Sequence, residues 1–351
     1  MNDRIDLILK ELIKENLDGV LITKEQNVFY LSGFKGSESR LFLTHKDKFF
    51  LTDFRYILQA KKELNGFKII QTKGTFSRDI SDLCNELRIK RLGFEAGNLP
   101  YREYIMLRRF IKKPRLIPTV NLVENFRKIK TAKEIGIIKR TVRIAITCLD
   151  FIKRNLCPGI SEKDFAAKID YFIKTNGGDD CAFKTIVASS SNSVIPHSIV
   201  TKRVMKKKDL VLIDFGVKFS GYNSDLTRVF SLGKINFYYK KFYSIITKAQ
   251  EIAIDQIRPG VRISDIELRV RNFLKGEGLE KFFGHSLGHG IGIEVHEAPK
   301  ISKDNKDCLE ENMVFTIEPG IYIPNLAGFR KEDMVVVTKT GCEVLTDDFN
   351  R

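Results

Sequence analysis

The chain has 351 residues, and its 60 lysines and arginines exceed its 44 aspartates and glutamates, which leaves a formal net charge of +16. Compact domains usually contain about 100–200 residues, so this length predicts two domains. With 43% hydrophobic and 30% charged residues, the chain has ample material for packed cores. This composition excludes an intrinsically disordered or fibrous protein.

Several features bear on location and partners. No apolar run approaches the roughly 18 residues that a membrane span needs, and the amphipathic start, residues 1–17, mixes acids and bases, unlike a signal peptide. We therefore expect a cytoplasmic protein with no membrane partner. The six cysteines form no C-x-x-C pair, which argues against a zinc ribbon or a disulfide framework. Because the basic residues are spread along the chain, we expect a solvated basic surface and no nucleic-acid partner.

The first third of the chain alternates amphipathic stretches with short β-branched or aromatic runs, which predicts a modest α/β domain. Helices are expected at the start, with Ile5, Ile8, Leu9 and Leu12 facing inward, and over Arg102–Phe110. The predicted strands are Gly19–Thr23, Leu41–Thr44, Phe49–Thr52, Phe67–Gln71 and Arg91–Glu95.

A domain boundary is expected between Pro114 and Glu124, giving domains of residues 1–122 and 123–351. Pro114 and Pro118 bracket an extended segment. Thr131 and Glu134 then have the spacing of a capping box, which predicts the start of a long helix.

The second domain contains a weak internal repeat. In each copy a helix ends at a Pro-Gly pair, Pro158-Gly159 or Pro259-Gly260, and a serine shortly afterwards, Ser161 or Ser264, is predicted to cap the next helix. Duplicated halves of this kind often enclose a site between them.

Acidic residues interrupt an apolar strand and the segment that follows it. Asp214 lies within Val211–Gly216, and Asp225 follows a turn at Ser220-Gly221. If Lys218 pairs with Gly221, antiparallel register places the two aspartates opposite each other, about 4.5–5.5 Å apart at Cβ. Two unpaired carboxylates that close repel each other, so a cation is expected between them.

A second acidic pair has the same construction near the C-terminus. Glu318 and Glu332 flank a turn around Pro324-Asn325, and a hairpin centred on Asn325 brings them together. Between the two acidic pairs lies a glycine-rich segment, residues 284–292, whose histidines include His289. Its glycines permit close backbone approach, and an imidazole is a softer nitrogen ligand. Four carboxylates and one imidazole suit a two-metal cluster better than a structural zinc site.

This constellation resembles a known family. In order and context, the five residues resemble the metal ligands of the pita-bread metallopeptidases, which include methionine aminopeptidase, Xaa-Pro aminopeptidase and prolidase: Asp214, Asp225, His289, Glu318 and Glu332. The segments Asn27–Phe34 and Leu51–Tyr56 resemble the creatinase-type N-terminal domain of the proline-specific branch. The implied fold is a small creatinase-type α/β domain followed by a duplicated pita-bread catalytic domain.

The resemblance also implies roles for individual residues. Asp214 would hold one metal, His289 and Glu318 the other, and Asp225 and Glu332 would bridge them. Glu318 would also shuttle protons. His197 and His296 would line the site, and His296 would stabilise the oxyanion. His285 would form a wall of the proline pocket. Arg330 would pair with a substrate carboxylate or with an acidic neighbour.

The function implied is a dinuclear exopeptidase that hydrolyses the Xaa-Pro bond at the N-terminus of peptides with proline in second position, an Xaa-Pro aminopeptidase. The alternative is an Xaa-Pro dipeptidase, or prolidase. An inactive pita-bread binding protein is a more distant alternative, and creatine amidinohydrolase, which works without metal, does not keep this ligand set. We expect two divalent ions, Mn²⁺ first and Co²⁺, Zn²⁺ or Fe²⁺ next. The resemblance also implies a homodimer.

Overall fold

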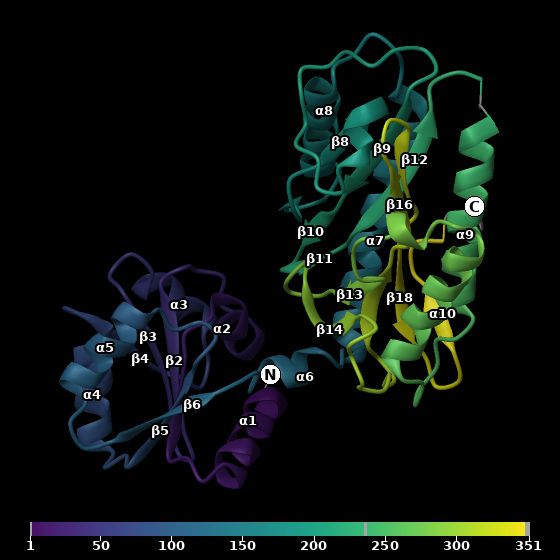
Figure 1. Ribbon diagram of the computed structural model, residues 1–351. Helices are drawn as coiled ribbons and strands as arrows, with labels where there is room; N and C mark the ends of the chain where they lie inside the picture. Colours follow the sequence, from purple (N-terminus) through teal and green to yellow (C-terminus); the bar gives the residue numbers. More distant parts are fainter. Residues whose placement is uncertain (1, 235–236, 348–351) are drawn as a thin grey trace. The chain divides into compact units, whose positions relative to one another are not determined.

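The computed structural model describes residues 2–234 and 237–347. The chain forms two compact units, Met1–Arg127 and Lys128–Arg351 (Figure 1). Each unit has its own sheets. Among the described residues, no helix is both long and apolar enough to cross a membrane.

The first unit is built on a six-stranded sheet with the order β4-β3-β2-β1-β5-β6. The β1–β2 and β2–β3 pairs are antiparallel, and the β1–β5, β3–β4 and β5–β6 pairs are parallel. Each strand expected from the sequence is present, within two residues at either end. The elements are α1 (Asn2–Lys14), β1 (Gly19–Ile22), α2 (Glu25–Ser32), β2 (Ser39–Thr44), β3 (Lys48–Thr52), α3 (Ile57–Glu63), β4 (Lys68–Gln71), α4 (Phe76–Glu86), β5 (Arg91–Glu95), α5 (Tyr101–Phe110), β6 (Arg115–Thr119) and α6 (Glu124–Arg127).

The short helix α6 belongs to the first unit, because its side chains bond to Asn27. The Asn27 amide donates to Glu124 Oε1 at 2.9 Å, and Arg127 Nη1 donates to Asn27 Oδ1 at 2.8 Å. The division into compact units falls after Arg127, and the domain boundary expected at 122/123 stays a prediction.

The described part of the second unit contains four long helices and several short antiparallel sheets, with strand orders β12-β9-β8, β11-β10-β7, β14-β13-β15-β18-β19 and β16-β17. The elements are α7 (Ala132–Asn155), α8 (Glu162–Thr175), β7 (Asp180–Cys181), β8 (Ile186–Ser189), β9 (Leu210–Phe215), β10 (Val217–Phe219), β11 (Tyr222–Asn223), β12 (Leu226–Ser231), α9 (Phe237–Ile254), α10 (Ile263–Gly276), β13 (Gly288–Gly290), β14 (Glu297–Ile301), β15 (Val314–Ile317), β16 (Gly320–Ile323), β17 (Ala327–Arg330), β18 (Asp333–Val337) and β19 (Cys342–Val344), with 3-10 turns at Ser190–Val194 and Glu280–Phe282.

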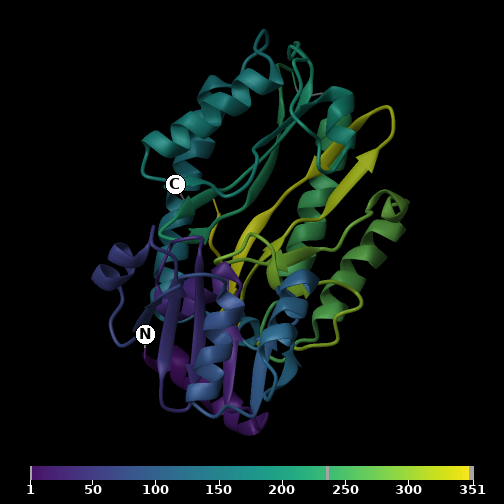
Figure 2. The ribbon, with the colours of Figure 1, turned by 90° about the vertical axis from the view of Figure 1, so that its left-hand side faces the viewer.

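Strands from both halves of this unit share one apolar core with α9 and α10. Leu212 and Val229 of the first half lie in the same buried cluster as Phe315 of the second half, together with Ile246 and Ile266 of the two helices. The α9–α10 pair lies to one side of these strands and α8 to the other, as the side view in Figure 2 also shows. The shared core fixes the acidic strands of the two halves relative to each other.

The internal repeat is visible in the backbone hydrogen bonds. Gly159 N donates to Met205 O at 2.9 Å, and in the second copy Gly260 N donates to Leu309 O at 2.8 Å. Three residues later in each copy, Glu162 N donates to Arg203 O and Ile263 N donates to Asp307 O. Each helix start is therefore held by a returning loop in the same way.

The two helix starts differ in their caps. Ser161 caps α8 as predicted, because its Oγ accepts from Asp164 N at 3.1 Å. The predicted cap at Ser264 is wrong: Arg262 occupies the N-cap position of α10 and forms no side-chain cap bond. Ser264 lies two positions after this N-cap, and its backbone N–H donates to Asn305 O. The capping box of Thr131 and Glu134 at the start of α7 is confirmed.

Candidate active site

In the first acidic pair, Asp214 lies within the β9–β12 ladder and Asp225 directly precedes β12, where the ladder is interrupted. Phe219 pairs with Tyr222 across the two-residue turn, so the residue opposite Asp214 is Thr227. The predicted direct pairing of Asp214 with Asp225 is therefore wrong by two residues. A shift of two residues keeps a side chain on the same face of a sheet, and both aspartates line one cavity.

The second acidic pair has the register predicted from the sequence. Gly320 pairs with Arg330 in the β16–β17 hairpin, and Ile317 pairs with Asp333 between β15 and β18. The two ladders are separated by a short interruption, in which Glu318 lies between β15 and β16 and Glu332 lies between β17 and β18. The hairpin centred on residue 325 therefore brings the two carboxylates into the same cavity.

The glycine-rich segment inserts His289 between β14 and β15. A Cβ at Gly288 would lie 1.9 Å from Thr316 O, and a Cβ at Gly290 would lie 2.2 Å from Ala298 O. Only glycine permits this close approach, as expected from the sequence. The approach carries the imidazole of His289 to the acidic cluster.

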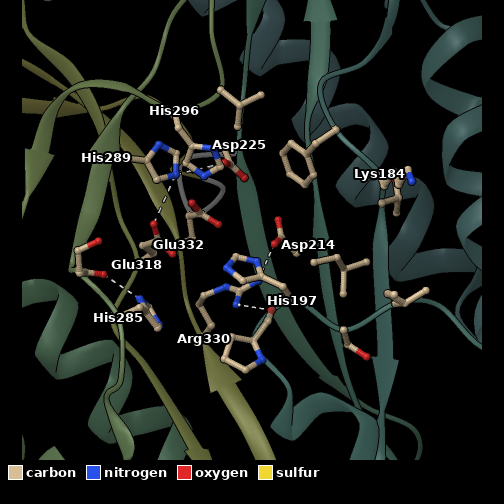
Figure 3. Close-up of a pocket in the computed structure, with 18 of the residues that line it drawn as sticks. Lys184, His197, Asp214, Asp225, His285, His289, His296, Glu318, Arg330 and Glu332 are labelled. Carbon is tan, nitrogen blue, oxygen red and sulfur yellow. Dashed lines mark hydrogen bonds and ion pairs between the residues drawn. The ribbon is translucent and has the colours of Figure 1, made fainter. Parts of the chain in front are cut away.

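His289 lies together with Asp225, Glu318 and Glu332 in Figure 3, and Asp214 lies to one side of them beside Arg330. His289 Nε2 lies 3.6 Å from Asp225 Oδ2 and 3.5 Å from Glu318 Oε1. One ligand atom each of Asp225, His289 and Glu332 lies within 4.8 Å of the others. This spacing is suited to a shared cation.

The electrostatics of the cluster also favour a cation. Burial, and then the neighbouring carboxylates, raise the pKa values of Asp225 and Glu332 well above their ordinary range. Burial raises the pKa of Glu318 to about 8, and burial together with His296 lowers the pKa of His289 to about 4. Packed carboxylates beside a neutral imidazole offer several oxygen donors and one nitrogen donor.

Two buried carboxylate oxygens without a hydrogen-bond donor indicate whether the residues fit a metal. The Oδ1 atoms of Asp214 and Asp225 are buried and accept no hydrogen bond from the described part of the chain. A buried carboxylate oxygen without a donor is costly unless a cation binds it. The donor set therefore fits divalent metal.

Arg330 is the internal partner of Asp214. Its Nη2 donates to Asp214 Oδ2 at 2.5 Å, and its Nε donates to Thr227 Oγ1. Nη1 donates to Tyr322 Oη at 2.7 Å and to Pro196 O at 3.2 Å. Four of the five guanidinium N–H groups are thus used within the protein. Of the two partners expected for Arg330, a substrate carboxylate or an acidic neighbour, the structure shows the acidic neighbour, Asp214.

A layer of buried polar groups supports the glutamates. Thr227 Oγ1 donates to Glu332 Oε2 at 2.6 Å. Arg228 donates from Nη1 to Glu332 O and forms an ion pair with Asp333 at 2.6 Å. Gln250 of α9 also donates to Asp333. No local sequence pattern indicates these supporting groups, because their roles depend on contacts across 80 or more residues.

The remaining predicted histidines line the same cavity, which has a volume of about 760 Å³. The ring centroid of His296 lies 4.2 Å from that of His289. His285 Nε2 lies 3.2 Å from Tyr322 Oη, and burial lowers the pKa of His285 to about 4. His197 is exposed at the cavity. The cavity also includes residues that the sequence analysis did not identify, among them Phe183, Lys184, Ile199 and Lys300.

Comparisons with known proteins give the family. Residues 136–339 match the model of metallopeptidase family M24, and residues 4–129 match the creatinase/prolidase N-terminal domain. An Xaa-Pro dipeptidase of Pyrococcus horikoshii is 34% identical over 99% of this chain and 97% of its own length.

Two solved structures agree in fold. An Xaa-Pro dipeptidase from Bacillus anthracis has a TM-score of 0.95 and 35% identity over 99% of this chain and 97% of its own. An X-Pro aminopeptidase from Thermotoga maritima has a TM-score of 0.89 and 35% identity over 95% and 96%. The predicted fold is confirmed. The chain belongs to metallopeptidase family M24, in the branch of prolidases and Xaa-Pro aminopeptidases, with a creatinase-type N-terminal domain before a pita-bread catalytic domain.

Proposed function

We propose that this protein is an Xaa-Pro dipeptidase. The observation that carries the proposal is the buried cluster of carboxylates and one imidazole in a family of metallopeptidases. The sequence analysis favoured an aminopeptidase, with the dipeptidase as its alternative. The order is reversed here because relatives of matching length, at 34% and 35% identity, are named Xaa-Pro dipeptidases.

Five residues are proposed to hold two divalent ions: Asp214, Asp225, His289, Glu318 and Glu332. By the resemblance, Asp225 and Glu332 would each contribute to both ions, and one ligand atom of each lies within 4.8 Å of the other and of that of His289. When bound, two such ions supply Lewis-acid polarisation of the scissile carbonyl and a water of low pKa. Oxygen donors with one histidine accept Mn²⁺, our first choice, and also Co²⁺, Zn²⁺ or Fe²⁺.

Other residues are proposed to act on the substrate directly. His296, beside His289, donates a hydrogen bond to the oxyanion that develops on the carbonyl oxygen. Glu318 carries the proton from the attacking water towards the leaving nitrogen. His197, exposed in the same cavity, is proposed to line the cleft in which the substrate binds. These assignments follow the resemblance residue by residue. They are supported by the fact that all three residues line the same cavity.

The proline of the substrate is proposed to bind beside His285, Tyr322 and Arg330. Tyr322 and Arg330 are buried, and the two are joined by a hydrogen bond of 2.7 Å. The rigid pyrrolidine ring of the substrate proline suits a preformed wall of this kind. The fifth N–H of Arg330 makes no hydrogen bond within the described part of the chain, and we propose that it donates to the proline carboxylate, which a dipeptide always presents at this position.

An aminopeptidase remains the second candidate. It is favoured by the similarity to the Thermotoga maritima X-Pro aminopeptidase and by Ile199, which lines the cavity with 84% of its surface exposed. An open cavity wall can accept a longer chain. The homodimer implied by the resemblance stays a prediction that analytical ultracentrifugation can test.

The experiment compares kcat/KM for Leu-Pro, Leu-Pro amide and Leu-Pro-Gly with Mn²⁺ added. Loss of a charge-assisted hydrogen bond to the carboxylate costs about 1.5–3 kcal/mol, so the dipeptide should exceed its amide by about tenfold or more. Equal or better cleavage of the tripeptide and the amide would make the protein an aminopeptidase. Absence of Xaa-Pro cleavage in all three would contradict both candidates.

A further inference from the structure

Lys184 lies at the edge of the proposed active site, two residues before β8. Ile186 of this strand pairs with Asp214, and Ala182 N donates to Gly216 O at 2.9 Å. Side chains alternate along an extended segment, so Lys184 and Ile186 belong to the same side as Asp214. Both Lys184 and Ile186 line the cavity.

The charge of Lys184 is available to a ligand. Its side chain is exposed and forms no ion pair or hydrogen bond with the described part of the chain. Arg330 differs, since it is buried and already paired with Asp214. An unpaired ammonium group beside a substrate cavity attracts anionic groups.

The cavity has two distinguishable ends. His285 and Arg330 line one end, the proposed proline end, and both contact the buried Tyr322. In Figure 3, Lys184 lies on the far side of Asp214 from His285 and Glu318. When the scissile bond lies at the acidic cluster and proline lies at the His285 end, the first residue of the substrate therefore extends towards Lys184.

We propose that Lys184 selects substrates whose first residue carries an anionic side chain. The inference rests on the proposed Xaa-Pro hydrolysis and adds a substrate class to it. Glutamate is the best match, because its carboxylate extends furthest from the backbone. The preference is modest, since the lysine is exposed and its interaction with a carboxylate is screened by water.

The experiment uses the matched dipeptides Glu-Pro and Gln-Pro, which have nearly the same shape and differ in charge. In the unaltered protein the ratio of kcat/KM for Glu-Pro over Gln-Pro should exceed one by about twofold to fivefold, as expected for an exposed ion pair. Lys184→Met should bring the ratio to about one, and Lys184→Glu should bring it below one.

Two further variants act as controls. Lys202→Met removes an exposed lysine close in sequence but outside the cavity lining, and should leave the ratio unchanged. Lys300 is the other lysine of the cavity and pairs with His289 across the β13–β14 ladder. If Lys300→Met lowered the ratio as much as Lys184→Met, general cavity charge would explain the preference and the assignment to Lys184 would be overturned.

The outcomes separate this inference from the proposed function. Turnover of both dipeptides with the same ratio in the unaltered protein and in Lys184→Met overturns the role of Lys184 and leaves Xaa-Pro hydrolysis standing. If Lys184→Met instead lowered the ratio of Gln-Pro over Gln-Pro amide, Lys184 would bind the proline carboxylate, and the assignment to the first residue would be overturned. No cleavage of any Xaa-Pro peptide would overturn both.

Discussion

Gln250 Nε2 donates a hydrogen bond of 2.9 Å to Asp333 Oδ2, and this contact joins helix α9 to strand β18. The same amide nitrogen lies 3.1 Å from Ile317 O and 3.2 Å from Lys331 O. Each of these carbonyls belongs to the residue immediately before one of the proposed glutamate ligands. One buried amide thus ties together the two strands that present those ligands.

Gln250→Leu should weaken metal binding by about 10–100-fold, the usual effect of removing groups that orient metal ligands. Titration calorimetry with Mn²⁺ measures this effect without relying on turnover. Gln256→Leu is the control, because Gln256 is half-buried just after α9 and makes no side-chain hydrogen bond within the described part of the chain. Unchanged affinity in Gln250→Leu would show that the amide contributes only to the fold.

Arg330→Met should destabilise the metal-free protein by about 3–5 kcal/mol, because it leaves the buried Asp214 carboxylate without its partner. Excess Mn²⁺ should recover part of this loss, since a bound cation would replace the guanidinium charge. Urea unfolding with chelator and with Mn²⁺ measures both values. Lys248→Met, which removes an exposed ion pair with Glu251, should change little. An equal loss with and without Mn²⁺ would argue against a metal at Asp214.

His285 should make the folded protein less stable in mild acid. Burial lowers its pKa from 6.5 to about 4 in the folded state, so between these values the unfolded chain binds a proton that the folded chain does not. Stability therefore falls as the pH drops through this window, by up to about 3 kcal/mol.

Urea unfolding in chelator at about pH 7.5 and about pH 5 measures this dependence. His285→Gln should lose less stability between the two values than the unaltered protein. The same loss in both proteins would mean that His285 is protonated in the folded state.

His296→Ala should lower kcat by about 10²–10³ while metal content stays nearly intact, as expected when an oxyanion-stabilising donor is removed. Single-substrate kinetics on Leu-Pro and elemental analysis of the same preparation measure the two effects. Loss of metal would identify His296 as a ligand, and normal kcat would return it to an ordinary surface histidine.

Local sequence patterns predicted much of the fold. The Thr131–Glu134 capping box and the hairpin centred on Asn325 depend on short spacings, and both are confirmed. The pairing of Asp214 was wrong by two residues because Ser220-Gly221 forms the whole turn, with Phe219 opposite Tyr222. The face was still right, since side chains alternate with a period of two.

Long-range contacts could not be predicted in this way. The bond from Arg330 to Asp214 spans 116 residues, and that from Gln250 to Asp333 spans 83. Neither has a local spacing that would reveal it. Ser264 failed as a cap for a related reason: the loop at Asn305 and Asp307 supplies the acceptors at the start of α10.

The most direct test of the account is metal content measured together with turnover. Purified protein is stripped with chelator, analysed for metal, and titrated with Mn²⁺ while Leu-Pro hydrolysis is followed. Since two ions are proposed to be held by five ligands, we predict no turnover without metal and full turnover at about two equivalents per chain. Full turnover by protein that elemental analysis shows to be metal-free would contradict the account.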